Sequence, residues 1–293
     1  MANTTFGSQW MHRQLINALR WIDVRWFYVF TTLFVVPICL LFNTNHSRTT
    51  AYRYFRERHG YGRWKSAWAT FVNHCLFSQV VVDRFAIFAG KHFDLNIVGY
   101  DNFLRLAAQD DGFMMFSSHV GCYEVAGCSL VSETKRFNAL VYGGEKETVM
   151  EGRKKKLDSN NITMIPILPD MSHLFKINEA LANNEIVSMP ADRSIGSSKT
   201  LTVQLLGAPA SLPMGPFSVA TMRSLDVIAV NVMKTSSKGY TAYVTPLAYD
   251  KQAPRREQMI QLAQSYAREL ETCIRQYPTQ WYNYYDFWQK TTT

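Results

Sequence analysis

Short apolar runs alternate with amphipathic segments along most of this chain, and that alternation restricts its fold more than any other feature. Strand-like runs lie at residues 93–98, 112–117, 137–142, 162–168, 185–190, 227–233 and 240–246. Apolar residues at helical spacing lie at 64–90, 101–110, 171–183 and 252–277, and residues 120–131 can start a further helix. Strands that alternate with helices in this way predict an α/β fold, with a mixed sheet flanked by helices. The length of 293 residues suits one such domain with an appendage.

A histidine and a glutamate follow the second strand-like run. His119 comes two residues after it, and Glu124 stands five positions further on, beyond Gly121. On a continuous helix two such residues point about 140° apart, so the pair needs a turn, which the glycine permits. A carboxylate that holds an imidazole makes it a general base for a hydroxyl group. The alternative is a chance pairing in which the histidine is structural.

A second polar residue stands at the end of another strand. Asp192 comes two residues after the run 185–190, as His119 comes two residues after 112–117. In open α/β sheets, ligands bind beyond the carboxyl ends of the strands. The two positions therefore predict a shared site.

An uncharged apolar run of 17 residues, 26–42, lies near the N-terminus. As a helix it is about 25 Å long, slightly short of a bilayer core of about 30 Å, and Pro37 predicts a kink. Residues 52–58 mix aromatic side chains with arginines, a composition typical of an interfacial helix on anionic lipid. The run predicts a membrane anchor, either spanning or inserted from the cytoplasmic side. A buried core helix is the alternative.

Charge and cysteine content exclude other classes of protein. Residues 1–65 hold nine Lys or Arg against two acidic residues, so they carry nearly all of the formal net charge of +8. That is not the diffuse basicity of a nucleic-acid binder. The five cysteines are odd in number and lack C-x-x-C spacing, which fits a reducing compartment. His119, Cys122 and Cys128 suggest no fourth ligand at structural-zinc spacing, so no metal is predicted.

Several motifs, in order, resemble a known family. The pair His119 and Glu124 resembles the first motif of the lysophospholipid acyltransferase superfamily, and most of all its late lipid A branch, the lauroyl and myristoyl transferases of Gram-negative bacteria. Segments similar to later motifs of that branch are Arg153 within 152–154, residues 190–192, 207–210, 213–216 and 277–288. Arg193 stands where many lipid A enzymes have Gln or His. With the run 170–173, it makes the chain similar to a Bacteroidetes-type subgroup whose acceptors the sequence does not name.

The resemblance implies roles for individual residues. His119 would deprotonate an acceptor hydroxyl, and Glu124 would fix the imidazole tautomer and stabilise the imidazolium. Arg153 would stabilise the oxyanion or grip an acceptor phosphate, or else is an exposed member of the basic run 153–156. Asp192 and Arg193 would position the acceptor, or pair with each other.

The motif at 207–216 is expected to form a loop near the site. Gly207, Pro213 and Gly215 are assigned to substrate binding through the shape of that loop rather than through direct contact. Lys199 and residues 154–156 could attract an acidic carrier protein, or form a solvated face. Residues 1–65 are expected to form the membrane-anchoring segment, and residues 66–293 the catalytic domain.

The resemblance implies acyl transfer without a cofactor, at the cell inner membrane with the catalytic domain on the cytoplasmic side. The donor would be an acyl thioester of acyl carrier protein or coenzyme A. The acceptor would be a lipid or glycolipid such as a lipid A precursor, or alternatively a phospholipid or aminolipid. Two other hypotheses stand beside this one: a thioesterase with Cys122 as nucleophile, and a non-catalytic membrane protein that binds lipid.

Overall fold

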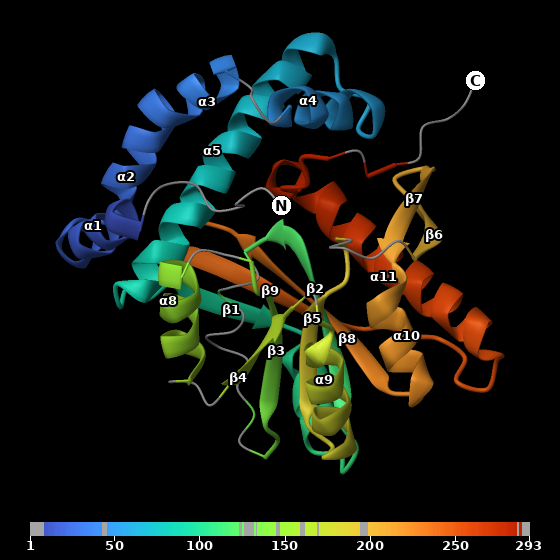
Figure 1. Ribbon diagram of the computed structural model, residues 1–293. Helices are drawn as coiled ribbons and strands as arrows, with labels where there is room; N and C mark the ends of the chain where they lie inside the picture. Colours follow the sequence, from blue (N-terminus) through green and yellow to red (C-terminus); the bar gives the residue numbers. More distant parts are fainter. Residues whose placement is uncertain are drawn as a thin grey trace.

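The computed structural model describes residues 9–42, 46–122, 125, 132, 134–144, 147–158, 162–168, 170–193, 199–285 and 287–288. Its centre is a seven-stranded sheet (Figure 1). The strands, in spatial order, are β1 (Asp94–Val98), β9 (Gly239–Pro246), β8 (Asp226–Lys234), β2 (Phe113–Gly121), β5 (Ile186–Pro190), β3 (Phe137–Tyr142) and β4 (Ile162–Ile167). Neighbouring strands are parallel except β8 and β9, which are antiparallel. The predicted mixed α/β sheet is therefore confirmed.

Helices cover both faces of the sheet, which explains why its central strands are apolar throughout. In β2, Met114 and Phe116 join one buried cluster, and Phe113 and Met115 join the other. The first cluster is covered by α9 (Ser172–Ala182), α10 (Met214–Met222) and α11 (Arg255–Gln276). The second is covered by α5 (Arg63–Phe88), α6 (Tyr100–Ala107) and α8 (Glu147–Asp158).

The N-terminal apolar run forms a helix that lies beside α5 (Figure 1). It consists of α2 (Val24–Phe30), a π-helical segment η1 (Thr31–Val35) and α3 (Val36–Phe42), preceded by α1 (Gln9–Trp21) and followed by α4 (Ser47–Glu57). The π-helical segment ends two residues before Pro37, which has no N–H to donate and whose ring crowds the carbonyl of Leu33, within that segment. The 19 residues Val24–Phe42 and the partly buried helix Arg63–Phe88 are each long and apolar enough to cross a membrane.

The structure corrects two local predictions. Residues 207–216 do not form a loop: Gly207 turns a hairpin between β6 (Thr200–Leu205) and β7 (Ala208–Pro213), and Gly215 lies in α10. The helix expected to start at Val120 does not start there, because β2 continues to Gly121; most of the rest of 120–131 lies outside the described residues. Ala210 and Leu212 of β7 are buried in the core cluster that includes side chains of α11, and α11 contacts β6, a tertiary contact that the prolines and glycine of this motif did not reveal.

Candidate active site

The ends of two adjacent parallel strands bring His119 and Asp192 together. Ser117 of β2 lies opposite Pro190 of β5, and the Ala191 N–H donates to the Ser117 carbonyl oxygen at 3.0 Å. The residues that follow β2 and those that follow β5 are therefore neighbours at the carboxyl ends of these two strands (Figure 1). The juxtaposition predicted from the two strand ends is present in the structure.

Asp192 holds His119 at two points. Its Oδ1 is 2.8 Å from His119 Nδ1, and its Oδ2 accepts the His119 backbone N–H at 2.7 Å. The Asp192 side chain is fully buried, whereas 18% of the His119 side chain is exposed. A carboxylate at Nδ1 favours the tautomer with the proton on that nitrogen, which places the lone pair on Nε2. The imidazole is thus fixed in orientation and tautomer, as a general base requires.

The electrostatic surroundings keep Asp192 ionised. Burial opposes the charged form, but the nearby charge of His119, its two hydrogen bonds and the charge of Arg193 outweigh burial. The pKa of Asp192 is therefore below its ordinary value. At neutral pH a carboxylate faces the imidazole, so an imidazolium formed during proton transfer would be stabilised.

The C-terminal segment 281–285 forms part of the site. The Tyr282 N–H donates to the His119 carbonyl oxygen at 3.2 Å, and Asn283 Nδ2 donates to Asp192 Oδ2 at 3.3 Å. Arg193 Nη2 donates to Asn283 Oδ1 at 2.7 Å and to the Tyr282 carbonyl oxygen at 3.0 Å. Arg193 therefore ties the end of β5 to this segment by hydrogen bonds and also favours the charge of Asp192.

The backbone of β2 changes register between Ser117 and Gly121, on either side of His119. Gly121 has φ +68°, and a Cβ there would lie 1.9 Å from the Val232 carbonyl oxygen. Only glycine allows this close approach to β8. Ser118 Oγ also donates to Asn231 Oδ1 of β8 at 2.6 Å. These contacts fix the irregular stretch of strand that presents the imidazole.

The structure locates the other predicted residues in different ways. Arg153 is buried in α8, so the alternative of an exposed residue in a basic run is wrong. Gly207 lies in the hairpin turn, Pro213 ends β7, and Gly215 is in α10. Their roles in substrate binding stay predictions. Glu124 lies outside the described residues.

Tyr282 and Asn283 had been predicted only as part of a C-terminal motif, with no role. Asn283 binds both Asp192 and Arg193 through its side chain, while Tyr282 binds His119 and Arg193 through its backbone. Their sequence gives a motif but no sign of the partner, because the contacts join distant parts of the chain. The sequence therefore identifies the C-terminal motif but not its contacts with the residues around His119.

Cys122 lies three residues after the histidine, and its environment is that of a core residue. Cys122 is 2% exposed and packs in the second core cluster, as expected of a small buried hydrophobe. Among the residues that the structure describes, no group of three or more His, Cys, Asp or Glu side chains could hold a metal ion. Cys128 lies outside those residues.

A carboxylate-held imidazole at the strand ends of an α/β sheet is an arrangement that can activate a hydroxyl group, and comparison with known proteins identifies the family of the chain. The family model of the bacterial lipid A biosynthesis acyltransferases matches residues 82–290, more than two thirds of the chain. The chain therefore belongs to this family. It is a lipid acyltransferase, which uses an acyl donor and a lipid acceptor. The match does not distinguish subgroups, so the Bacteroidetes-type assignment stays a prediction.

The chain is also similar to solved structures, among them the 1-acyl-sn-glycerophosphate (LPA) acyltransferase PlsC from Thermotoga maritima. It has 14% sequence identity and a TM-score of 0.41, and the match covers 88% of this chain and 99% of that one. No curated protein matches the chain.

Proposed function

We propose that this acyltransferase moves a fatty acyl chain from the thioester of acyl carrier protein to a hydroxyl group of a lipid or glycolipid, such as a lipid A precursor. The observation that supports this most directly is the contact between His119 and the buried Asp192. It gives the enzyme a base of fixed tautomer whose side chain is still partly exposed to an incoming hydroxyl. Coenzyme A is the alternative donor.

In the proposed reaction, His119 Nε2 takes the proton of the acceptor hydroxyl as its oxygen attacks the thioester carbonyl. Asp192 keeps the Nδ1 proton and stabilises the imidazolium. The tetrahedral oxyanion then collapses, the C–S bond breaks, and the departing thiolate takes the proton from Nε2. The products are the ester and the free carrier thiol, so no cofactor is needed.

The two carboxylates have different proposed roles. Sequence assigned both tautomer control and imidazolium stabilisation to Glu124, yet Asp192 occupies Nδ1 in the structure. We therefore propose that Asp192 fixes the tautomer and that Glu124 adds only to the field that stabilises the imidazolium.

The other predicted residues surround the reaction. We propose that Arg153 binds the oxyanion or an acceptor phosphate, since guanidinium groups bind such oxygens bidentately. Arg193 and Asp192 would help to shape the acceptor site, with Gly207, Pro213 and Gly215 shaping its border.

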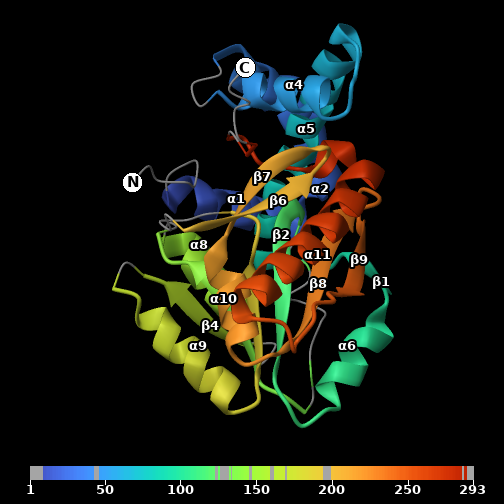
Figure 2. The same cartoon turned by 90° about the vertical axis from the view of Figure 1, so that its right-hand side faces the viewer.

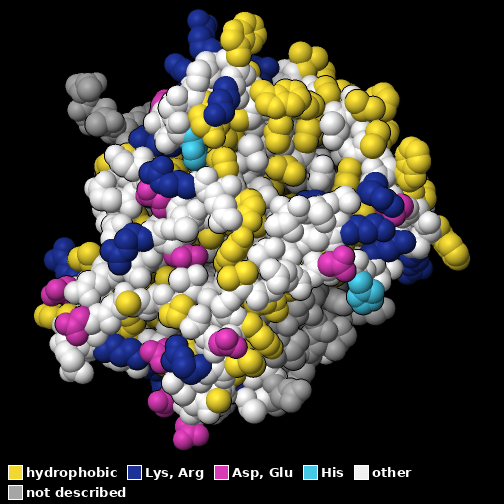
Figure 3. Space-filling view, turned by 180° about the vertical axis from the view of Figure 1, so that it is seen from behind, with side chains coloured by type: hydrophobic (Ala, Val, Ile, Leu, Met, Phe, Trp, Pro, Cys, Tyr) yellow, Lys and Arg dark blue, Asp and Glu magenta, His cyan; other side chains and the backbone are white. Residues whose placement is uncertain are grey.

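We further propose that the N-terminal helices lie at the inner membrane, with the catalytic domain on the cytoplasmic side. Five of the seven tryptophans are more than 60% exposed, and all five lie in or next to these helices: Trp10, Trp21, Trp26, Trp64 and Trp68. Tryptophan favours the boundary between lipid and water. Figure 3 shows hydrophobic side chains gathered on this part of the surface, with Lys and Arg at its margins.

The proposed division at residue 65 is one of function rather than of folding. Tyr54 and Phe55 of α4 belong to the main core cluster, together with residues of the sheet. Residues 1–65 would thus serve the membrane while part of them completes the core of the catalytic domain, 66–293.

The proposal is tested by lipid mass spectrometry of the source organism with and without the gene. Loss of one acyl chain from a specific lipid, restored by the wild-type gene but not by His119→Ala, would support the proposal and identify the acceptor. A phospholipid or aminolipid acceptor would appear in the same experiment. An unchanged lipidome, or full rescue by His119→Ala at matched protein level, would contradict the proposed reaction.

A further inference from the structure

A cavity of about 570 Å³ lies where α3, α4 and α5 meet. Its lining is mostly apolar atoms, contributed in part by Leu40 of α3 and Ala67 of α5, and it also includes two arginines of α4, Arg48 and Arg53. Figure 2 shows α4 beside the upper end of α5, at the extremity of the molecule away from the sheet. The cavity is therefore part of the surface that we assign to the membrane.

The helix α4 has two chemically different faces, because residues three and four apart lie on one side of a helix. One face carries Arg48, Thr49, Tyr52 and Arg53, all of which line the cavity. The side turned towards the protein carries Ala51, Tyr54 and Phe55, which are buried. The arginines are thus held on a helix that is anchored from behind, so the cavity is a formed feature of the surface.

The two arginines have the chemistry of an anion site. Arg48 Nη1 donates to the Leu40 carbonyl oxygen at 2.9 Å, which fixes its guanidinium at the end of α3. A guanidinium has five N–H donors in a planar fork that matches phosphate oxygens. Residues 46–65 hold six Lys or Arg against one acidic residue, so the surroundings are strongly positive.

Apolar surface continues from the cavity along α3. Ile38, Leu41 and Phe42 are 55%, 73% and 70% exposed. An anionic group at the arginines would therefore have a route along which a hydrocarbon chain leaves water. At about 25 cal/mol per Å² of apolar surface, such a chain adds greatly to the binding of a charged head group.

We propose that this cavity binds an anionic phospholipid of the bilayer, with its phosphate on Arg48 and Arg53 and its acyl chain along Leu40 and the outer side of α3. This site is separate from the acceptor site at His119. The proposal of this lipid site rests on the proposed function, which places the N-terminal helices at the membrane. It adds the binding of a specific lipid at that surface. Charge complementarity selects an anionic lipid over a zwitterionic one.

The buried face of α4 gives this lipid a connection to the active site. Tyr54 OH donates to the Pro278 carbonyl oxygen at 3.0 Å, and the Tyr54 ring lies 4.8 Å from that of Trp281. Trp281 pairs with Val120, the residue after His119. A lipid that holds α4 in place would thereby support the segment that frames the histidine.

Direct binding of a soluble short-chain lipid to the full-length purified protein tests the site. Dihexanoyl phosphatidylglycerol, used below its micelle concentration, should bind more tightly than dihexanoyl phosphatidylcholine in calorimetric titration. The double variant Arg48→Gln/Arg53→Gln should weaken phosphatidylglycerol binding by about tenfold or more. Arg63→Gln is the matched control, because it removes a charge from the same basic region at an exposed residue that does not line the cavity; its affinity should stay within about twofold.

A second variant covers the case in which the arginine changes loosen the helices. Ala67→Phe keeps every charge but should fill part of the cavity, so it should also weaken phosphatidylglycerol binding. Three results would contradict the proposed site: equal affinity for the two lipids, an equal loss of phosphatidylglycerol affinity in all variants including the control, or unchanged binding in both cavity variants.

Acyl transfer measured on the same preparations separates this proposal from the proposed function. His119→Ala should lower transfer by about 10³-fold or more and leave phosphatidylglycerol binding unchanged. If the cavity variants bind lipid as wild type does while His119→Ala is inactive, the lipid site is wrong and the catalytic proposal stands. If His119→Ala is fully active while the cavity variants lose lipid binding, the reverse holds.

Discussion

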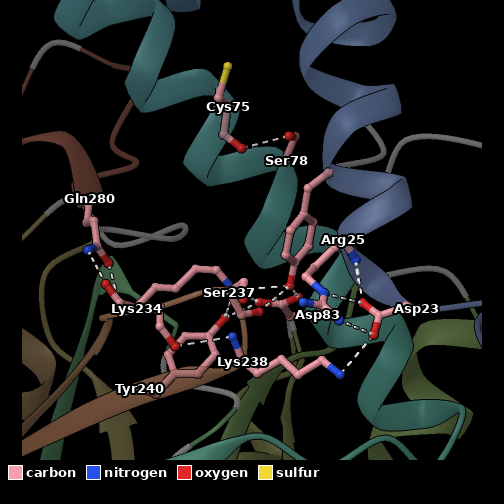
Figure 4. A network of polar contacts seen from close by, with 12 residues as sticks. Asp23, Arg25, Cys75, Ser78, Asp83, Lys234, Ser237, Lys238, Tyr240 and Gln280 are labelled. Atoms are coloured by element: carbon pink, nitrogen blue, oxygen red, sulfur yellow. Dashed lines mark hydrogen bonds and ion pairs between the residues drawn. The ribbon is translucent and has the colours of Figure 1, made fainter.

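Two buried carboxylates in this protein each face a basic nitrogen, and they differ in what surrounds the pair. Asp192 contacts His119, whose side chain is 18% exposed. Asp83 of α5 contacts Lys234 of β8, and the two side chains are 0% and 3% exposed. Tyr28 of α2 and Tyr240 of β9 also donate to Asp83, so the second pair is enclosed by protein groups (Figure 4).

In the proposed mechanism, this difference separates a reactive pair from a structural one. Asp83 accepts hydrogen bonds from an ammonium and two phenols, which joins the N-terminal helix, α5 and the sheet. Gln280 also bonds both the N–H and the carbonyl oxygen of Lys234, at 2.9 and 2.8 Å, directly before the segment that frames His119. The enclosed pair supports the segment around His119, whereas in the proposed mechanism the partly exposed pair exchanges a proton with the substrate.

The largest expected effect is on turnover by Asp192→Asn. An amide at this position no longer enforces the Nδ1–H tautomer or stabilises the imidazolium, so kcat should fall by about 10³- to 10⁴-fold. Steady-state acyl transfer by the purified variant measures this. The matched change Asp83→Asn should lower kcat by less than tenfold when the protein is assayed folded; a similar loss in both variants would remove the distinction between the two pairs.

The next effect is on stability, and it falls on the enclosed pair. Asp83→Asn leaves the Lys234 ammonium buried without its carboxylate, so the free energy of unfolding should drop by about 3–5 kcal/mol. Asp83→Asn/Lys234→Met removes the charge as well and should recover more than half of the loss. Urea unfolding of the three proteins checks this, and a double variant no more stable than the single one would contradict the explanation.

Lowering the pH should reduce the contribution of Asp192 to the free energy of unfolding. The pKa of Asp192 is lowered in the folded protein, so its contribution to stability is present above the ordinary Asp pKa of about 3.9. It is lost as pH falls through the lower folded value. Unfolding free energies of wild type and Asp192→Asn, measured from about pH 7 to pH 3, should therefore converge as pH falls; a constant or widening difference would show that the carboxylate is not stabilised by folding.

The smallest effect concerns the link from the N-terminal helix to the enclosed pair. Tyr28→Phe removes one donor to Asp83 and a contact to the Ser237 carbonyl oxygen at 3.1 Å. The unfolding free energy should fall by about 1–2 kcal/mol with little change in kcat. Tyr249→Phe is the control for loss of a hydroxyl bonded only to the Leu225 carbonyl oxygen, at 2.7 Å, in a part of the fold away from Asp83.

The fold class could be predicted from the sequence because it depends on the local pattern of apolar residues. The runs 137–142, 162–168 and 240–246 agree with β3, β4 and β9 to within a residue at each end. The hairpin β6–β7 was not predicted, because prolines at 209 and 213 read as a loop until α11 packs against the hairpin. Strand order could not be read at all, since it depends on contacts between distant segments.

The candidate site was partly predictable for the same reason. The positions of His119 and Asp192 at strand ends follow from local pattern together with the general rule for α/β sheets. Their direct contact does not, because it requires β2 and β5 to be neighbours. Asn283 and the enclosed Asp83–Lys234 pair carry no local signal, and only the folded chain brings their partners within reach.

Acyl transfer by purified wild type and His119→Ala, with a carrier-bound acyl thioester and the lipid acceptor found in vivo, tests the central claim most directly. The rate of transfer with both substrates bound should fall at least as far as in Asp192→Asn, by about 10³- to 10⁴-fold, because Asp192 acts only through this imidazole. Circular dichroism of the same samples should be unchanged. Transfer at the wild-type rate by folded His119→Ala would show that the histidine does not activate the acceptor hydroxyl.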